Sequence, residues 1–160
     1  KGPLPEWSLT NGAYALLSVF QSSEMQFLSL QERLKIARFV VFQVGGRVPV
    51  IASGHVSDSI EMQHEELTAL SQTGIDAIVL VTNRLDPENR GSDAFKENLT
   101  NILTLLPPEL PLGLYECPAP FRRLLNDDEL VFCCESGRFV VLKDVSCDLE
   151  TLQRLSPRHI

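Results

Sequence analysis

Short apolar runs typical of β-strands recur along this chain at intervals of about 30 residues, the length of one strand–helix unit. They begin near residues 14, 48, 76, 111 and 138. Amphipathic stretches with helix-start and helix-stop signals lie between them. Because strands that alternate strictly with helices must run parallel, the pattern predicts an α/β domain with a parallel sheet of five strands.

The expected elements can be placed by residue number. Strands are expected at 13–20, 48–52, 76–82, 111–118 and 138–144. Helices are expected at 5–11, 29–44, 58–73, 92–106, 126–136 and 148–155. Ser29 and Glu32 form a capping-box pattern at the start of the second helix, and Ser92 is expected to cap the fourth. The stretch 21–26 is expected to be a plain loop.

Composition favours one soluble globular domain over residues 1–160, since 44% of the residues are hydrophobic and 22% are charged. The net charge of −7 argues against nucleic acid and anionic membranes as partners. No apolar run approaches the roughly 20 residues of a membrane span, and we expect a cytoplasmic protein. The cysteines at 117, 133, 134 and 147 follow no zinc spacing, so we interpret them as reduced thiols.

Reactive side chains end two neighbouring strands of the predicted sheet. Lys143 is the one lysine of the four that closes a β-branched, apolar run, and Tyr115 ends the preceding strand. Burial would lower the pKa of the Lys143 amine, and a neutral amine can attack a ketone to form a Schiff base. Asp144 should point away from Lys143, because alternate strand residues face opposite sides. The alternatives are a lysine that reaches solvent or pairs with Asp144, and a core tyrosine whose hydroxyl is satisfied by a neighbour.

The motifs L-Y-E-C-P and, one unit later, V-L-K-D resemble the dihydrodipicolinate synthase / N-acetylneuraminate lyase family. The resemblance runs from about residue 13 to 155. It implies a (β/α)8 TIM barrel in which Lys143 forms an imine with pyruvate or another 2-oxo acid and Tyr115 moves protons. An aldehyde would be the second partner, no cofactor would be needed, and the protein would form homo-oligomers, commonly tetramers.

The resemblance also points to groups that would hold the substrate. Ser22 and Ser23 lie in the loop where family members bind the pyruvate carboxylate, although the glycines of that loop are replaced by Phe20 and Ser23. An ordinary strand-to-helix loop is the alternative. His55 follows the second strand and would face the site, with a plain loop histidine as its alternative. The other histidines lie elsewhere in the chain, so we expect no metal site.

At two positions the sequence differs from dihydrodipicolinate synthases in a way that bears on the substrate. Dihydrodipicolinate synthases carry an arginine where this chain has Pro120, and a tyrosine where it has Leu85. Arg122 and Arg123 are near the first position but out of register. We therefore expect that condensation of pyruvate with aspartate semialdehyde is not the reaction.

The chain is shorter than a complete (β/α)8 barrel. A (β/α)8 barrel takes roughly 250 residues, whereas this chain has 160 and five expected strands. By the resemblance, the first strand and the last two are missing, so we expect a fragment, or the ordered part, of a longer protein. The alternative to a lyase is a degenerate, non-catalytic family member with a ligand-binding or structural role.

Overall fold

The computed structural model describes residues 4–150, and within them a single parallel sheet runs in chain order from β1 to β5. Its strands are β1 (Leu16–Ser18), β2 (Val50–Ala52), β3 (Ala77–Val81), β4 (Leu112–Tyr115) and β5 (Phe139–Lys143). Every neighbouring pair is parallel. The predicted α/β class and strand order are confirmed.

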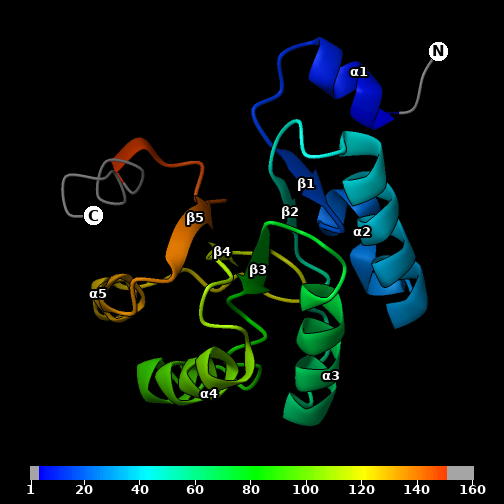
Figure 1. The fold of residues 1–160 in the computed structure, drawn as a ribbon. Coiled ribbons are helices and arrows are strands. Elements are labelled where there is room, and N and C mark those ends of the chain that lie inside the picture. The colour runs from blue at the N-terminus through cyan, green and yellow to red at the C-terminus, as the bar shows by residue number, and fades with distance from the viewer. Residues whose placement is uncertain (1–3, 151–160) are drawn as a thin grey trace.

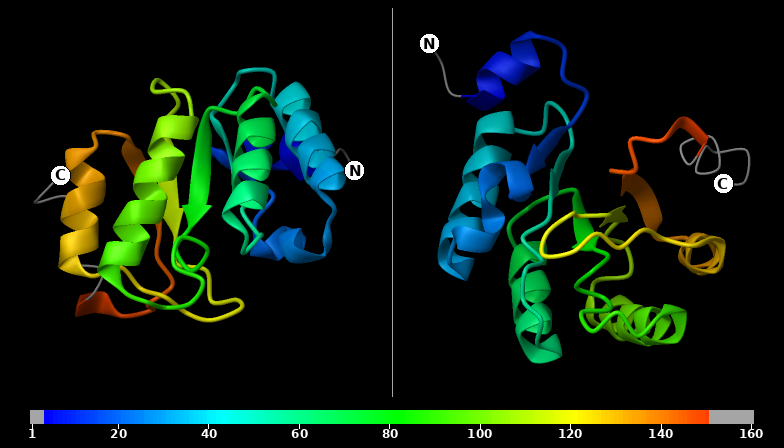
Figure 2. Two further views of the ribbon diagram at one scale, coloured as in Figure 1. Left: turned by 90° about the horizontal axis from the view of Figure 1, so that it is seen from below. Right: turned by 180° about the vertical axis from the view of Figure 1, so that it is seen from behind.

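Helices follow the strands in alternation. They are α1 (Leu4–Thr10), α2 (Leu30–Val44), α3 (Ile60–Ser71), α4 (Ser92–Leu105) and α5 (Asp127–Glu135), with short 3-10 turns η1 (Gln21–Ser23) and η2 (Met25–Phe27) after β1. Helices α2 to α5 form an outer arc around the strands and cover one face of the sheet (Figures 1 and 2). The opposite face is the concave, inner one, as in a barrel that is only partly closed.

Local sequence signals account for the helix boundaries. At the start of α2, the Ser29 hydroxyl accepts from the Glu32 N–H, and the Glu32 carboxylate accepts from the Ser29 N–H at 2.8 Å. The same reciprocal pair joins Asn126 and Glu129 at the start of α5. Both capping boxes satisfy helix N–H groups that have no partner within the helix, so the chain turns into a helix there.

Some predicted boundaries were wrong. Gly91, with φ +105°, is the N-cap of α4, and Ser92 is its first helical residue. The Ser92 hydroxyl instead accepts a hydrogen bond from Asn126 Nδ2 at 2.8 Å. The first strand is shorter than expected because Val19 leaves the extended region at φ +59°, and the expected loop at 21–26 contains the two 3-10 turns. The helix expected at 148–155 lies largely outside the described residues.

The core lies between the sheet and the helical arc. All residues of β3 are buried, as expected for the central strand of a parallel sheet. The outer strands are more open: Leu17 on β1 is 52% exposed and Val140 on β5 is 65% exposed. In the described part of the chain, these two strands have a neighbour on one side only.

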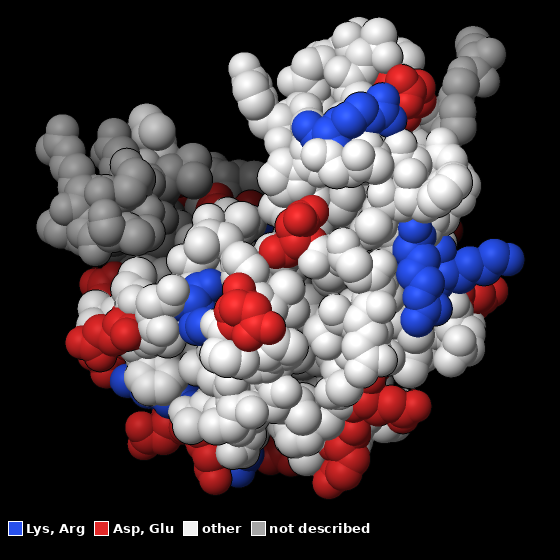
Figure 3. All heavy atoms as spheres, viewed as in Figure 1, with Lys and Arg blue, Asp and Glu red and all other residues white. Residues whose placement is uncertain are grey.

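The surface carries mixed charge. On the face shown in Figure 3, acidic side chains lie mainly over the outer helices, and basic side chains form only small groups among them. All four cysteines are free, as predicted. Of the described helices, none combines the length and the apolar character needed to cross a membrane.

Gly113 should be intolerant of any side chain, because β4 packs closely on both neighbouring strands there. A Cβ at this position would lie 3.0 Å from the Val141 carbonyl oxygen and 3.0 Å from Val79 Cγ2. Gly113→Ala should therefore lower the free energy of unfolding by about 1–3 kcal/mol, the usual cost of overpacking. Urea denaturation measures it, and an unchanged stability would show that the two neighbouring strands yield freely.

Candidate active site

The register of the sheet puts three side-chain positions at the same level. Val81 on β3 pairs with Tyr115 on β4, which pairs with Lys143 on β5. All three stand at the C-terminal ends of their strands, where parallel α/β folds build their sites. The Lys143 Nζ lies 3.7 Å from the centroid of the Tyr115 ring. The structure thus brings together the two side chains that the sequence predicts to be catalytic.

The segment after β1 supplies two more side chains to this centre. The Tyr115 hydroxyl donates a hydrogen bond to Gln21 Oε1 at 3.1 Å, and the Cys117 thiol lies 3.6 Å from the same oxygen. The Phe20 ring packs at 5.5 Å from the Tyr115 ring, and the Lys143 Nζ lies 5.7 Å from Phe20. Sequence reasoning missed Phe20 and Gln21, although both lie within the loop that it had singled out.

The backbone of that segment is strained where it turns toward the site. Val19 and Glu24 both have positive φ, at +59° and +54°. This region is rare for residues other than glycine and costly for a β-branched one such as Val19. The positive φ angles of these two residues let Phe20 and Gln21 reach back to the sheet instead of continuing along β1.

The protein environment shifts the pKa values of Lys143 and Tyr115 in opposite directions. Burial lowers the pKa of the Lys143 amine, while the nearby Cys117 sulfur opposes this shift. The faces of the Tyr115 and Phe20 rings also favour the ammonium form. Burial, followed by the Cys117 sulfur, raises the pKa of Tyr115. The amine is therefore moved toward its neutral form, and the phenol keeps its proton.

Acidic groups beside the two strand ends face away from Lys143. The Asp144 carboxylate accepts from the backbone N–H of Ser146 at 3.0 Å and from its hydroxyl at 2.9 Å. Glu116 is buried and accepts from the Leu125 N–H at 2.8 Å. Burial, with the adjacent Asp144 carboxylate, raises the pKa of Glu116. Within residues 4–150, the pKa of Lys143 is shifted by burial and by Cys117, and no carboxylate contributes.

His55 is fully buried, and both of its ring nitrogens have protein partners. Nδ1 accepts from the Val81 N–H at 3.1 Å, so Nε2 carries the proton and donates to Gln63 Oε1 at 2.8 Å. The Gln63 amide nitrogen in turn donates to the carbonyls of Asp58 and Arg84. Only the carbon edge of the ring is left to line a site, and its predicted contact with substrate stays a prediction.

Ser22 and Ser23 are exposed on η1, beside Gln21, and their role in holding a carboxylate also stays a prediction. Neither hydroxyl is placed against Tyr115 or Lys143, whereas the Gln21 side chain accepts a hydrogen bond from Tyr115. Among residues 4–150, no three His, Cys, Asp or Glu side chains gather in a way that could hold a metal ion.

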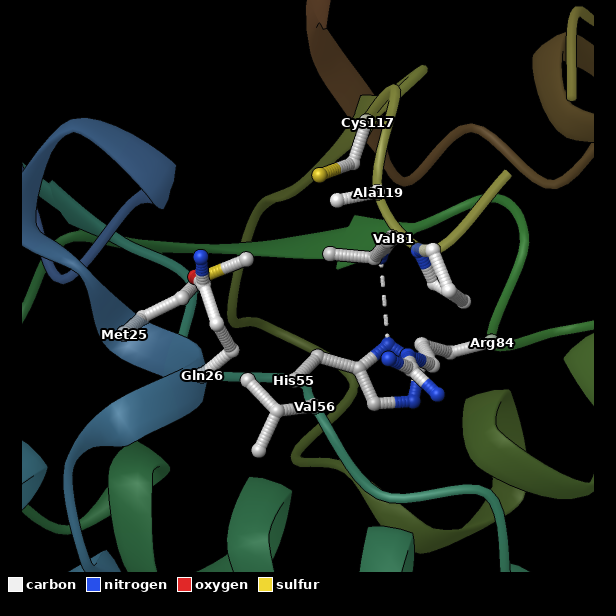
Figure 4. Close-up of a pocket in the computed structure, with 9 residues that line it drawn as sticks. Met25, Gln26, His55, Val56, Val81, Arg84, Cys117 and Ala119 are labelled. Carbon is white, nitrogen blue, oxygen red and sulfur yellow. Dashed lines mark hydrogen bonds between the residues drawn. The ribbon is translucent and has the colours of Figure 1, made fainter. Parts of the chain in front are cut away.

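A pocket of about 160 Å³ lies next to this centre, at the same end of the sheet (Figure 4). Its wall includes Cys117, which also contacts Gln21, and Val81, which pairs with Tyr115. The remaining lining residues are Met25, Gln26, His55, Val56, Arg84, Ala119 and Pro120. The pocket is mostly apolar, and Arg84 is its one charged lining residue.

The segment that carries Cys117 and Pro120 is held by the end of β3. Asn83 Nδ2 donates to the carbonyls of Cys117, Ala119 and Phe121, at 2.9, 3.1 and 2.6 Å. The Thr82 hydroxyl donates to the Arg123 carbonyl at 2.7 Å. These bonds fix one wall of the pocket.

Arg122 and Arg123, which lie near the expected arginine position, point elsewhere. Arg123 is buried in ion pairs with Asp86 at 3.2 Å and Glu129 at 2.7 Å. Arg122 donates to the Val145 carbonyl at 2.9 Å.

The buried His55 should make stability depend on pH. Burial is the main cause that lowers its pKa to about 4, from 6.5 in the unfolded chain. Between these values the unfolded chain binds a proton that the folded chain does not, so stability falls as the pH falls through this window, by up to about 3 kcal/mol. His55→Gln, whose amide can make both hydrogen bonds without titrating, should lose this part of the dependence. Urea denaturation at pH 7 and pH 5 tests it, and parallel losses in both proteins would contradict it.

Comparison with known proteins places the chain in a family. Residues 4–152 match the model of the Dihydrodipicolinate synthetase family. The 4-hydroxy-tetrahydrodipicolinate synthase of Pseudomonas putida (strain W619) is 36% identical over 149 residues, which are 92% of this chain and 49% of that protein. The enzyme of the same name from Cellvibrio japonicus (strain Ueda107) is 29% identical over 153 residues, covering 95% and 51%.

A solved structure shows the same likeness in three dimensions. The chloride-inhibited dihydrodipicolinate synthase from Acinetobacter baumannii, complexed with pyruvate, superposes with a TM-score of 0.81 at 26% identity, over 95% of this chain and 50% of that one. The chain spans about half the length of the relatives it matches. It belongs to the dihydrodipicolinate synthetase family, and its five-stranded sheet is part of a (β/α)8 barrel.

Proposed function

We propose that the whole protein is a metal-independent, Schiff-base-forming lyase or aldolase, which makes or breaks a carbon–carbon bond between a 2-oxo acid, such as pyruvate, and an aldehyde. One observation carries the proposal. The Lys143 amine, with its pKa lowered by burial, lies 3.7 Å from the centroid of the Tyr115 ring at the C-terminal ends of paired strands.

The first stage joins the 2-oxo acid to Lys143. The neutral amine adds to the ketone carbon, and an internal proton transfer gives a carbinolamine. The Tyr115 phenol gives its proton to the carbinolamine hydroxyl, which leaves as water, and an iminium forms. Because burial raises the pKa of Tyr115, its resting form holds the proton that this step needs.

The second stage makes the carbon–carbon bond. The Tyr115 phenolate recovers a proton from the methyl group next to the iminium, which leaves an enamine. The enamine carbon attacks the aldehyde carbon, and the new alkoxide takes the proton back from Tyr115. Water then hydrolyses the iminium and frees Lys143, and bond cleavage follows the same path in reverse. The protonated imine accepts the electrons, so the scheme uses no metal or organic cofactor.

Neighbouring groups would orient the reactants. Gln21 holds the Tyr115 hydroxyl through its carboxamide oxygen at 3.1 Å. Ser22 and Ser23, on the same turn, would help to hold the carboxylate of the 2-oxo acid, and the carbon edge of His55 would line the site. Self-association of the whole protein is also part of this proposal.

Borohydride trapping tests the proposal. Protein incubated with pyruvate and sodium borohydride should gain one reduced adduct per chain, and peptide mass spectrometry should locate it at Lys143. Tyr115→Phe should form the same adduct more slowly, because it removes the proton carrier and leaves the nucleophile.

Two lysine variants control this experiment. Lys143→Ala should abolish the adduct, whereas Lys96→Ala, which removes an amine paired with Asp128 on the outer surface, should leave it unchanged. If no 2-oxo acid gives an adduct at Lys143, the Schiff-base mechanism fails and a non-catalytic role takes its place.

A further inference from the structure

We propose that Glu116 is a positioning residue: with Asp144 it forms a carboxylic acid–carboxylate pair that shares one proton and holds together the two strand ends that carry Tyr115 and Lys143. The pair lies on the side of these strand ends that faces away from the Lys143 amine, and the reaction scheme above gives it no role. The strand register, a buried carboxyl oxygen without a donor and its contact with a second carboxyl group carry the inference.

The strand register puts the two carboxyl groups next to each other. Tyr115 pairs with Lys143, so Glu116 and Asp144 each follow a paired residue on adjacent parallel strands. The Glu116 N–H donates to the Lys143 carbonyl at 3.3 Å, which is long for a backbone hydrogen bond. A side-chain contact between Glu116 and Asp144 therefore adds a second link where the backbone link is weak.

The Glu116 carboxyl group is buried and only partly satisfied by donors. The residue is 1% exposed, and its Oε1 accepts from the Leu125 N–H at 2.8 Å. Within residues 4–150, Oε2 has no hydrogen-bond donor. The side chain is instead in hydrogen-bond contact with the Asp144 carboxyl group. Two ionised carboxylates can only accept, so this contact requires one proton between them.

The surroundings place that proton on Glu116. Burial would raise the pKa of Asp144, but hydrogen bonds from the Ser146 N–H and hydroxyl, at 3.0 and 2.9 Å, and the nearby Arg122 guanidinium lower it. Burial raises the pKa of Glu116, the Asp144 carboxylate adds to this shift, and backbone N–H groups oppose it only in part. Asp144 is therefore the carboxylate of the pair, and Glu116 is the acid.

The neighbouring elements offer Glu116 no counter-charge. Arg123, on the loop after β4, is paired with Asp86 and Glu129. The Lys143 amine lies against the aromatic rings on the other side of the strand ends. Within residues 4–150, no cation is among the groups that shift the pKa of Glu116. A proton is thus what neutralises the buried member of the pair.

The shared proton makes the link depend on pH. Because burial raises the pKa of Glu116 above 4.5, its value in the unfolded chain, the folded protein keeps a proton that the unfolded chain releases. The free energy of unfolding therefore falls as the pH rises from 4.5 through the folded pKa. Once the proton leaves, two carboxylates in contact repel each other and the ends of β4 and β5 separate.

NMR of the protein without substrate tests the protonation. With carbon-13 at the glutamate side-chain carboxyl carbons, one signal should titrate above 4.5 and be absent in Glu116→Gln. Asp144→Asn, whose amide can donate to an ionised Glu116, should move this titration to lower pH. In urea denaturation, Glu116→Gln should lose the fall in stability between pH 4.5 and the folded pKa, because its amide donates to Asp144 at any pH.

The proton signals of the Lys143 ε-methylene group test the positioning. The Tyr115 ring, whose centroid lies 3.7 Å from the amine, should shift these signals upfield. At one pH, the shift should persist in Glu116→Gln and be largely lost in Glu116→Leu, which removes the link. Glu135→Leu, which removes an exposed glutamate of α5, is the matched control and should leave the shift unchanged.

Three results would overturn the inference. They are a Glu116 signal that titrates at or below 4.5, an unchanged Lys143 shift in Glu116→Leu, and a stability that rises with added K⁺ or Mg²⁺ in the protein but not in Glu116→Gln, which would show a cation in place of the proton. Should Glu116→Leu fail to fold, the Lys143 shift still decides: compared with Glu116→Gln at each pH, it must shrink as Glu116 ionises. These measurements need no 2-oxo acid, so they stand or fall separately from the proposed function.

Discussion

The parallel register of β3, β4 and β5 is the constraint on which this site depends. It puts Val81, Tyr115 and Lys143 side by side at the C-terminal edge of the sheet. Gly113 allows the three strands to approach, because any Cβ there would meet Val79 and the Val141 backbone at 3.0 Å. A one-residue slip of β5 would turn Lys143 toward the helices and bring Asp144 to the inner face. The sheet thus decides which side chain meets the tyrosine.

Buried ion pairs hold the loops at this edge. Glu66 pairs with Arg33 at 2.8 Å and accepts hydrogen bonds from the Val56 and Ser57 N–H groups, which fixes the loop after β2. Arg123 joins Asp86 to Glu129 and so ties the loop after β3 to the start of α5. Removing one partner of such a pair strongly destabilises the folded protein, because the other charge is then buried and unpaired. They give the loops that surround the pocket a defined geometry.

Much of the fold could be predicted from the sequence because its signals are local. The interval of about 30 residues between strands is enough to predict parallel neighbours in chain order, and the Ser29 and Asn126 boxes mark helix starts. Placing Lys143 and Tyr115 at strand ends was enough to expect them together, because parallel neighbours share an edge. Asp144 could be directed away from Lys143 by strand alternation alone.

What could not be predicted depends on contacts between distant parts of the chain. The Gln21 contact with Tyr115 joins residues 94 positions apart and requires the positive φ of Val19. His55 is buried, and its Nδ1 accepts a hydrogen bond from the N–H of Val81, 26 residues later. Gly91 rather than Ser92 caps α4, and Ser92 bonds to Asn126, 34 residues away. No periodicity or spacing in the sequence carries this information.

The fold lowers the pKa of Lys143 although aromatic rings and a sulfur beside the amine favour its charged form. Carbon-13 NMR of protein labelled at the lysine ε-carbons measures it directly, with Lys143→Ala to assign the signal. Lys143 should titrate below the ordinary value of 10.5 and apart from the other lysines. A Lys143 signal that titrates at or above 10.5, together with the surface lysines, would contradict it.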